Sequence, residues 1–206
     1  GKIINYSGYE IKAIKSLNGF WDFDTKFVKE YRHIQNNTVV SIDRCFMIYQ
    51  IAQAVKNVPG DMAELGVYKG GTAHIILEAT RGTDKKLFLF DTFEGLPPTG
   101  VLSIEKDNIE NKDSFSNNSV ELVKEFLSQK SDIKRVIFKE GFFPQTTHGL
   151  ENNKFSLAYL DADLYQSMKD GLEFFYPRMN KGGIIIIDDY QSQCWPGTTQ
   201  AVHEFR

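Results

Sequence analysis

The sequence predicts an α/β protein with a doubly wound, mostly parallel sheet and helices on both faces. Three observations predict this fold. Short apolar runs alternate with helix-like segments over residues 41–206, which is the pattern of a parallel sheet. A glycine-rich turn follows the first apolar run. Each of the five apolar runs also ends in an acidic residue, and a parallel sheet gathers its strand ends at one edge.

The composition limits the class of protein. A chain of 206 residues suits a single domain with a sizeable core. Its net charge of −3 and scattered basic residues do not indicate a nucleic-acid partner. No apolar run approaches the roughly 18 residues of a membrane span, and we expect no signal peptide. Cys45 and Cys194 are too few for a disulfide framework, so we expect a reduced, cytoplasmic setting without nucleic-acid or membrane partners.

Residues 1–40 are rich in aromatic side chains that follow no clean period. We expect short helices here, packed over the main domain of residues 41–206. One interpretation is ordinary core packing. Another is a lid that closes over a substrate, and a third is a contact between subunits of a homo-oligomer.

The remaining elements follow from apolar spacing and from turn residues. A helix with Ser41 as its N-cap precedes a Pro-Gly stop at 59–60, and a polar, turn-rich stretch at 99–118 is interpreted as a loop. The last strand is continuously apolar, which predicts that both of its faces are covered. We expect helices at 41–56, 71–80, 119–129 and 164–176, a further helix from about residue 198, and strands at 61–66, 86–91, 136–140, 155–160 and 183–187.

The turn after the first strand predicts a nucleoside site. Its glycines follow the pattern Gly66-x-x-x-Gly70-Gly71, which differs from the G-x-G-x-x-G that seats a pyrophosphate. Glu64 precedes the turn and would repel phosphate, but it suits a cationic amine or sulfonium. Asp91 ends the next strand, where a carboxylate binds ribose hydroxyls. The pattern therefore favours S-adenosylmethionine over a dinucleotide.

Acidic residues end the later strands as well. Glu140 follows the third, Asp161 and Asp163 follow the fourth, and Asp188 and Asp189 follow the fifth. Clustered carboxylates repel one another unless a cation compensates, and oxygen ligands without His or Cys suit Mg²⁺. The simpler interpretations are helix capping, for which Asp163 is the better candidate of its pair, and a turn or N-cap at Asp188 and Asp189.

Other residues carry less information. Phe142 and Phe143 could flank an adenine ring or pack in the core, and Trp195 could wall a substrate site. The four histidines are isolated in the sequence, so we interpret them as structural or exposed residues rather than catalytic ones. They are His33, His74, His148 and His203.

Several motifs together resemble the macrocin O-methyltransferase family over about residues 40–205. They are Ala63-Glu64-Leu65-Gly66-Val67-Tyr68-Lys69-Gly70-Gly71, Asp91-Thr92-Phe93-Glu94-Gly95-Leu96-Pro97, Glu140-Gly141-Phe142-Phe143, Leu160-Asp161-Ala162-Asp163-Leu164-Tyr165 and Asp188-Asp189-Tyr190. The resemblance implies the class I, Rossmann-like methyltransferase fold, S-adenosylmethionine as donor, Mg²⁺ as metal, and methylation of a sugar hydroxyl on a natural-product glycoside. That fold has two further strands after the last helix, and the sequence stops at Arg206, so C-terminal strands are expected to be missing.

The resemblance also implies roles for individual residues. Asp161, Asp188 and Asp189 match the metal positions, with Asp163 as a rival for the first of them. Asp161 and Asp163 are also the candidates for the group that accepts the proton of the acceptor hydroxyl. The expected cofactor-binding residues are Glu64, Gly66, Tyr68, Gly70, Gly71, Thr72, Asp91, Thr92, Phe93, Glu140, Gly141, Phe142 and Asp161.

Two other functions stay open at this point. A metal-dependent hydrolase could use the same acidic edge, although it would lack an evident His base. A non-catalytic module that binds a nucleoside or a partner protein is the second alternative. Fold alone does not decide among these.

Overall fold

The computed structural model describes residues 3–6, 9–12, 19–96, 105, 115 and 117–205. Five parallel strands form its central sheet, in the order β5-β4-β3-β6-β7. The strands are β3 (Asp61–Leu65), β4 (Leu87–Asp91), β5 (Val136–Glu140), β6 (Phe155–Leu160) and β7 (Met179–Ile187). The predicted parallel α/β sheet is therefore confirmed.

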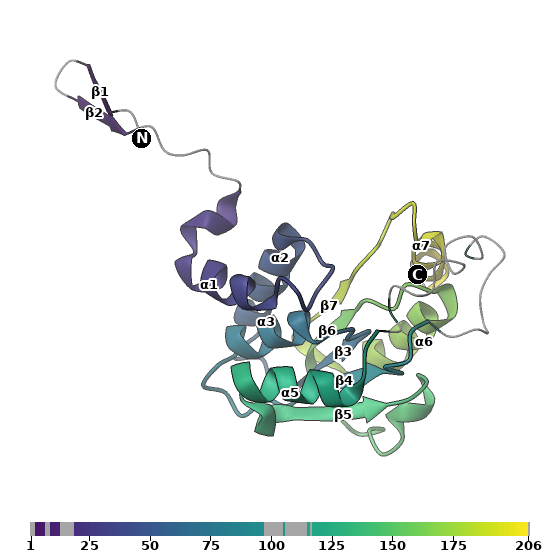
Figure 1. The fold of residues 1–206 in the computed structure, drawn as a ribbon. Coiled ribbons are helices and arrows are strands. Elements are labelled where there is room, and N and C mark those ends of the chain that lie inside the picture. Colours follow the sequence, from purple (N-terminus) through teal and green to yellow (C-terminus); the bar gives the residue numbers. More distant parts are fainter. Residues whose placement is uncertain are drawn as a thin grey trace.

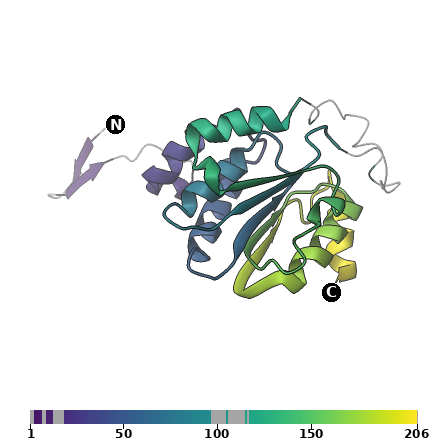
Figure 2. The same ribbon diagram turned by 90° about the horizontal axis from the view of Figure 1, so that it is seen from below.

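Helices cover both faces of this sheet (Figures 1 and 2). One face carries α1 (Thr25–Ile34), α2 (Ile42–Ala54), α3 (Gly71–Ala79) and α5 (Val120–Lys130). The other carries α6 (Tyr165–Phe175) and α7 (Pro196–Phe205). Short 3-10 turns occupy Phe20–Phe23, Ile133–Arg135, Gln145–Thr147 and Tyr176–Arg178. None of the described helices combines the length and the apolar character that a membrane crossing needs.

Alternation along the strands divides the core into two layers. Met62 of β3 packs in the cluster beneath α1, α2, α3 and α5, whereas Ala63 and Leu65 pack in the cluster beneath α6 and α7. Side chains of a strand point alternately to its two faces, so Glu64 shares the face of Met62. This places a carboxyl group in the layer under α3, where it is fully buried.

The strand order places a crevice at the centre of the sheet. From β3 the chain runs outward through β4 to β5, then returns to β6 on the other side of β3 and continues to β7. In sheets of this kind ligands bind where the order reverses, outside the carboxyl ends of the strands. Here that point lies between the end of β3 and the end of β6, and the backbone N–H of Asp161 donates to the Leu65 carbonyl at 2.8 Å.

The N-terminal segment differs in part from the expectation of short helices. Helix α1 and the 3-10 turn that precedes it confirm the predicted short helices for residues 20–34. Residues closer to the N-terminus instead form an antiparallel hairpin of β1 (Ile3–Tyr6) and β2 (Tyr9–Lys12), with Tyr6 opposite Tyr9. β-branched and aromatic residues in both strands favour a hairpin over a helix. In both views the hairpin lies away from the sheet (Figures 1 and 2). That residues 1–40 act as a lid over a substrate stays a prediction. Most of the predicted loop at 99–118 lies outside the described residues.

Strand β7 also differs from the prediction. It begins at Met179, four residues before the expected start at 183, and it is an edge strand of the described sheet. Its side chains are mostly half-buried, and Ile184 is 36% exposed. Ile186 packs against the core on one face of β7, and Ile185 and Ile187 pack against the core on the other face. Both faces are therefore covered in part, as the apolar run predicted, even though β7 has a strand neighbour on one side only. Helix α7 begins at Pro196, two residues earlier than expected.

Candidate functional site

A cavity of about 1160 Å³ opens at the carboxyl edge of the sheet, above the crevice between β3 and β6. Sites for small molecules usually measure about 300–1,000 Å³, so this cavity has room for a cofactor beside a second molecule. Loops after all five strands of the sheet contribute to its wall. The predicted site residues that line it are Gly66, Tyr68, Thr72, Asp91, Thr92, Glu140, Gly141, Phe142, Asp161, Asp163, Asp188 and Asp189.

The turn after β3 is shaped by the strand beside it. Gly66 has φ of +86°, and a side chain there would overlap the carbonyl oxygen of Asp161. Glycine meets both requirements because it has no Cβ and adopts positive φ without strain. The turn is thereby held against the acidic end of β6.

Asp91 fixes the same turn from the other side. Its Oδ2 accepts hydrogen bonds from the backbone N–H groups of Val67 (2.7 Å) and Tyr68 (3.0 Å), and its Oδ1 accepts from Phe93 N–H (2.8 Å). An ionised carboxylate can accept about four hydrogen bonds. Asp91 also lines the cavity, so it holds the turn and still offers oxygen to a ligand.

Glu64 lies beneath the turn. It is fully buried, and its Oε1 accepts a hydrogen bond from the Thr72 hydroxyl. Its Oε2 is buried and has no hydrogen-bond partner within the described part of the chain. Burial raises the pKa of Glu64 to about 8, against the lowering effect of the Thr72 hydrogen bond. The turn therefore covers a carboxyl group that is largely protonated at neutral pH in the ligand-free protein.

Four residues expected to bind the cofactor do not line the cavity: Glu64, Gly70, Gly71 and Phe93. Packing explains the two glycines. A Cβ at Gly71 would lie 2.7 Å from the Asn37 carbonyl oxygen, and one at Gly70 would lie 2.9 Å from a Val123 methyl carbon. These residues shape the turn from behind, and their contribution to cofactor binding stays a prediction.

Three aspartates converge at the ends of β6 and β7. Carboxylate oxygens of Asp161, Asp163 and Asp189 all lie within 4.8 Å of one another. Burial raises the pKa of each group, and the neighbouring carboxylates raise it further. The Tyr159 hydroxyl donates to Asp161 Oδ2 at 3.0 Å. We call Asp161, Asp163 and Asp189 the aspartate trio.

Helix capping does not explain this trio. The N-cap of α6 is Leu164, without a side-chain cap, and the Tyr165 N–H donates instead to Glu105 Oε1 at 2.7 Å. Asp163 and Asp189 have φ of 56° and 54°, a left-handed conformation in which Asp is tolerated better than most residues. Both side chains are therefore held in the cavity wall by unusual backbone geometry.

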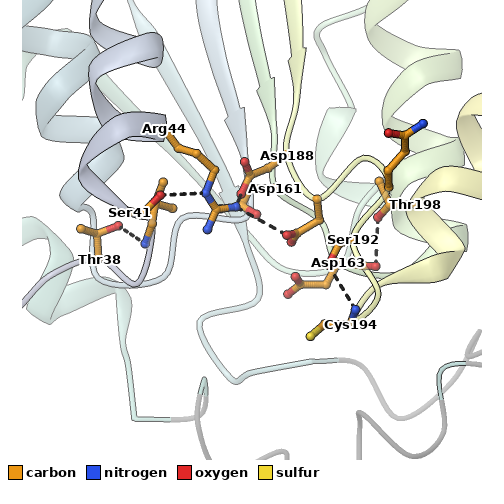
Figure 3. A network of polar contacts seen from close by, with 12 residues as sticks. Thr38, Ser41, Arg44, Asp161, Asp163, Asp188, Ser192, Cys194 and Thr198 are labelled. Atoms are coloured by element: carbon orange, nitrogen blue, oxygen red, sulfur yellow. Dashed lines mark hydrogen bonds and ion pairs between the residues drawn. The ribbon is translucent and has the colours of Figure 1, made fainter. Parts of the chain in front are cut away.

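Arg44 is a site residue that the sequence reasoning missed. It extends from α2 toward the ends of β6 and β7 (Figure 3), where its Nη1 donates to Asp188 Oδ2 at 2.5 Å and to Asp189 Oδ1 at 3.5 Å. Asp188 is thus paired with a guanidinium group, whereas the sequence had grouped it with Asp161 and Asp189. A separation of 144 residues leaves no local pattern that would have indicated this pair.

The two aromatic residues after β5 have different surroundings. Phe142 is 49% exposed and lines the cavity. Phe143 also lines the cavity, but its ring packs against Phe90, Phe174 and Phe175 at centroid distances of 5.4–5.9 Å. Of the two interpretations of these residues, core packing therefore applies to Phe143, whereas the ring of Phe142 is available to a ligand. Trp195 lines the cavity, as a wall of the site would.

Comparison with known proteins decides the family. The model of the macrocin-O-methyltransferase (TylF) family matches residues 30–206. This chain belongs to the macrocin O-methyltransferase family. Membership makes it an O-methyltransferase of the class I, Rossmann-like fold, and it replaces the two alternatives of a hydrolase and a non-catalytic module.

Individual relatives agree with this assignment. Demethyldecarbamoylnovobiocin O-methyltransferase of Streptomyces niveus is 32% identical over 179 residues, covering 82% of this chain and 68% of its own length. An 8-demethyl-8-(2,3-dimethoxy-alpha-L-rhamnosyl)-tetracenomycin-C 4'-O-methyltransferase of Streptomyces olivaceus is 29% identical over 182 residues, covering 82% of this chain and 67% of its own length. The chain therefore spans about two thirds of these relatives.

Solved structures give the same fold. The O-methyltransferase NovP matches with a TM-score of 0.73 and 31% identity, covering 82% of this chain and 73% of its own. The calicheamicin methyltransferase CalS11 matches with a TM-score of 0.65 and 20% identity, covering 88% and 84%. The second match, at this identity, bears on the fold alone.

Proposed function

We propose that this chain transfers a methyl group from S-adenosylmethionine to a hydroxyl of a sugar or glycosylated natural product, with Mg²⁺ held by the aspartate trio. One observation carries the proposal. A single cavity joins a nucleoside-type turn, formed by Gly66 and Asp91, to three convergent carboxylates. Methyl transfer onto a weakly acidic hydroxyl needs a donor site and an acceptor site in the same cavity, because the reacting atoms of donor and acceptor must be held side by side.

The donor half rests on the turn and on the aromatic residue beside it. Asp91 offers oxygen at the end of β4, where ribose hydroxyls bind in folds of this kind, and Phe142 has an exposed ring face at the end of β5. Glu64 lies buried beneath the turn, and a cationic donor bound above it would favour the ionised form of its carboxyl group. S-adenosylmethionine, when bound, supplies a methyl group already activated by its sulfonium.

The metal half rests on the chemistry of the trio. Buried carboxylates this close repel one another, and a divalent cation would relieve that repulsion. Oxygen-only ligands are the kind that Mg²⁺ prefers, so the residues fit the ion. Arg44 pairs with Asp188 at 2.5 Å and lies farther from Asp189, at 3.5 Å, so we take Asp161, Asp163 and Asp189 as the ligands. Mg²⁺, when bound, supplies positive charge that lowers the pKa of a nearby hydroxyl.

The proton of the acceptor hydroxyl is taken up by a side chain of the protein. A carboxylate of the trio, Asp161 or Asp163, accepts the proton that the acceptor oxygen loses as its bond to the methyl carbon forms. The turn and the cavity walls align acceptor and donor, which is the main task when the methyl group is already reactive. We expect adjacent hydroxyls in the acceptor, because a vicinal diol offers two oxygens to one cation.

The test is donor turnover with a glycoside that carries a vicinal diol and with its monodeoxy analogue. Formation of S-adenosylhomocysteine together with a methylated glycoside is the expected result for the diol only. Asp189→Asn and Asp163→Asn should each lower kcat/KM by at least about a hundredfold. Glu173→Gln, an exposed carboxylate on α6, is the matched control and should keep wild-type turnover.

Metal dependence is tested separately. Chelator followed by dialysis should abolish turnover, and Mg²⁺ should restore it in wild type but not in Asp189→Asn. Undiminished turnover after complete metal removal would reject the metal and leave the methyl transfer standing. Failure to bind S-adenosylhomocysteine would reject the transferase itself.

A further inference from the structure

A second cluster of metal-ligating side chains lies outside the cavity. Glu30 and His33 are one turn apart on α1, and His74 lies on α3. One ligand atom of each lies within 4.8 Å of those of the other two. None of the three lines the cavity, so this cluster is separate from the aspartate trio.

The distances within the cluster match a metal site. Glu30 Oε2 lies 3.2 Å from His74 Nε2 and 3.4 Å from His33 Nδ1. Ligand atoms bonded to a tetrahedral Zn²⁺ at about 2.0–2.1 Å lie about 3.3 Å from one another. A single carboxylate oxygen thus faces two imidazole nitrogens at the separation that a shared ion would set.

The surroundings of His74 also fit a ligand. Its ring is fully buried, and Nδ1 lies 2.8 Å from the hydroxyl of Ser131, directly after α5. A metal-binding histidine usually uses its second nitrogen for such a contact, which fixes the tautomer and the ring orientation. In the tautomer in which Nδ1 donates to the Ser131 hydroxyl, the lone pair of Nε2 is directed at the cluster.

Exposure decides what kind of site this is. Glu30 is nearly buried, whereas the His33 side chain is 38% exposed. Three protein ligands with one open side allow a water molecule at a fourth position. Two imidazoles and one carboxylate suit Zn²⁺ better than Mg²⁺, which prefers oxygen alone.

We propose that Glu30, His33 and His74 bind one Zn²⁺ ion that joins α1 to α3. Helix α3 begins at Gly71, directly after the turn of the cavity, so the ion would fasten the N-terminal helix to the element that supports the turn. The competing arrangement is a metal-free cluster, in which both imidazoles donate hydrogen bonds to Glu30. The inference is independent of the methyl transfer proposed above.

The experiment measures Zn²⁺ binding by the chelator-treated protein, with excess Mg²⁺ present and a chromophoric chelator as competitor. Wild type should bind one equivalent of Zn²⁺, and His33→Ala should bind Zn²⁺ at least about tenfold more weakly than wild type. His33 is partly exposed, so this variant should fold. Zn²⁺ should raise the melting temperature of wild type and not of His33→Ala.

Further variants separate a ligand site from adventitious binding. Glu30→Gln removes the charged ligand with little change of shape, and Ser131→Ala removes the contact that orients His74; each should weaken binding about tenfold or more. His148→Ala is the matched control, because His148 forms the same i,i+3 pair with Glu151 on the surface, at 3.6 Å. Equal Zn²⁺ affinity in wild type and His33→Ala, or no binding by wild type, would overturn the proposal.

Discussion

The guanidinium of Arg44 donates to the Asp188 carboxylate at 2.5 Å, across 144 residues of sequence. The pair joins α2, on one face of the sheet, to the carboxyl end of β7. Asp188 is buried, whereas the Arg44 side chain is 38% exposed. Asp188 is thereby neutralised by the protein, whereas Asp189 lies farther from the same guanidinium, at 3.5 Å, and belongs to the aspartate trio.

Removing Arg44 should destabilise the fold. Arg44→Met leaves Asp188 buried beside the trio without its partner, and we expect a loss of about 1–2 kcal/mol in the free energy of unfolding. Loss of one partner from a fully buried pair costs about 3–5 kcal/mol, and the exposure of Arg44 reduces this. Urea denaturation of chelator-treated protein measures it. Asp188→Asn added to Arg44→Met should recover most of the loss, and purely additive effects of the two changes would disprove the coupling.

A substitution at Gly66 should reveal the close contact between the turn and β6. Gly66→Ala combines positive φ with overlap of the Asp161 carbonyl, and we expect a destabilisation of about 3 kcal/mol or more. Gly82 has a similar φ of +82°, and a Cβ added there would meet nothing within 4 Å. Gly82→Ala should therefore cost only the backbone strain, about 1–2 kcal/mol. Equal melting temperatures for the two variants would argue against the contact.

The buried Glu64 should make stability depend on pH. Its folded pKa of about 8 lies above the ordinary value of 4.5, so between these values the native state binds more protons than the unfolded state. Stability from this group is therefore fully present below about pH 4.5 and is lost as pH rises toward 8. Glu64→Gln cannot ionise, and its stability relative to wild type should rise by ~3–5 kcal/mol from pH 5 to pH 9. Denaturation of ligand-free protein across this range measures the difference, and parallel curves would contradict the shifted pKa.

The two phenylalanines after β5 should separate ligand binding from folding. Phe142→Ala should raise the Kd of S-adenosylhomocysteine about 5- to 100-fold, since stacking of a base on an aromatic ring contributes about 1–3 kcal/mol. Its melting temperature should change little, because Phe142 is half exposed. Phe143→Ala should instead lose about 3–5 kcal/mol of stability through its packing in the core. Calorimetry and thermal melts distinguish the two, and unchanged affinity in Phe142→Ala would remove it from the cofactor site.

Much of the fold follows from local patterns in the sequence. The apolar runs at 61–66, 86–91 and 155–160 predicted the three inner strands. Ser41 is the N-cap of α2, as predicted, although its side chain makes no capping hydrogen bond. These signals succeed because periodicity and capping depend on neighbours within a few residues. The N-terminal hairpin and the edge position of β7 were missed, since each depends on which partner a segment finds.

The site, like the fold, depends partly on local sequence and partly on tertiary contacts. The sequence by itself determined that glycines and carboxylates would meet at one edge of a parallel sheet, because strand direction fixes where strand ends lie. Only the tertiary structure decided that Asp163 joins Asp161 and Asp189, that Arg44 takes Asp188, and that Glu64 lies beneath the turn. These choices depend on side-chain directions and on contacts between distant elements, which packing sets and which no local spacing encodes.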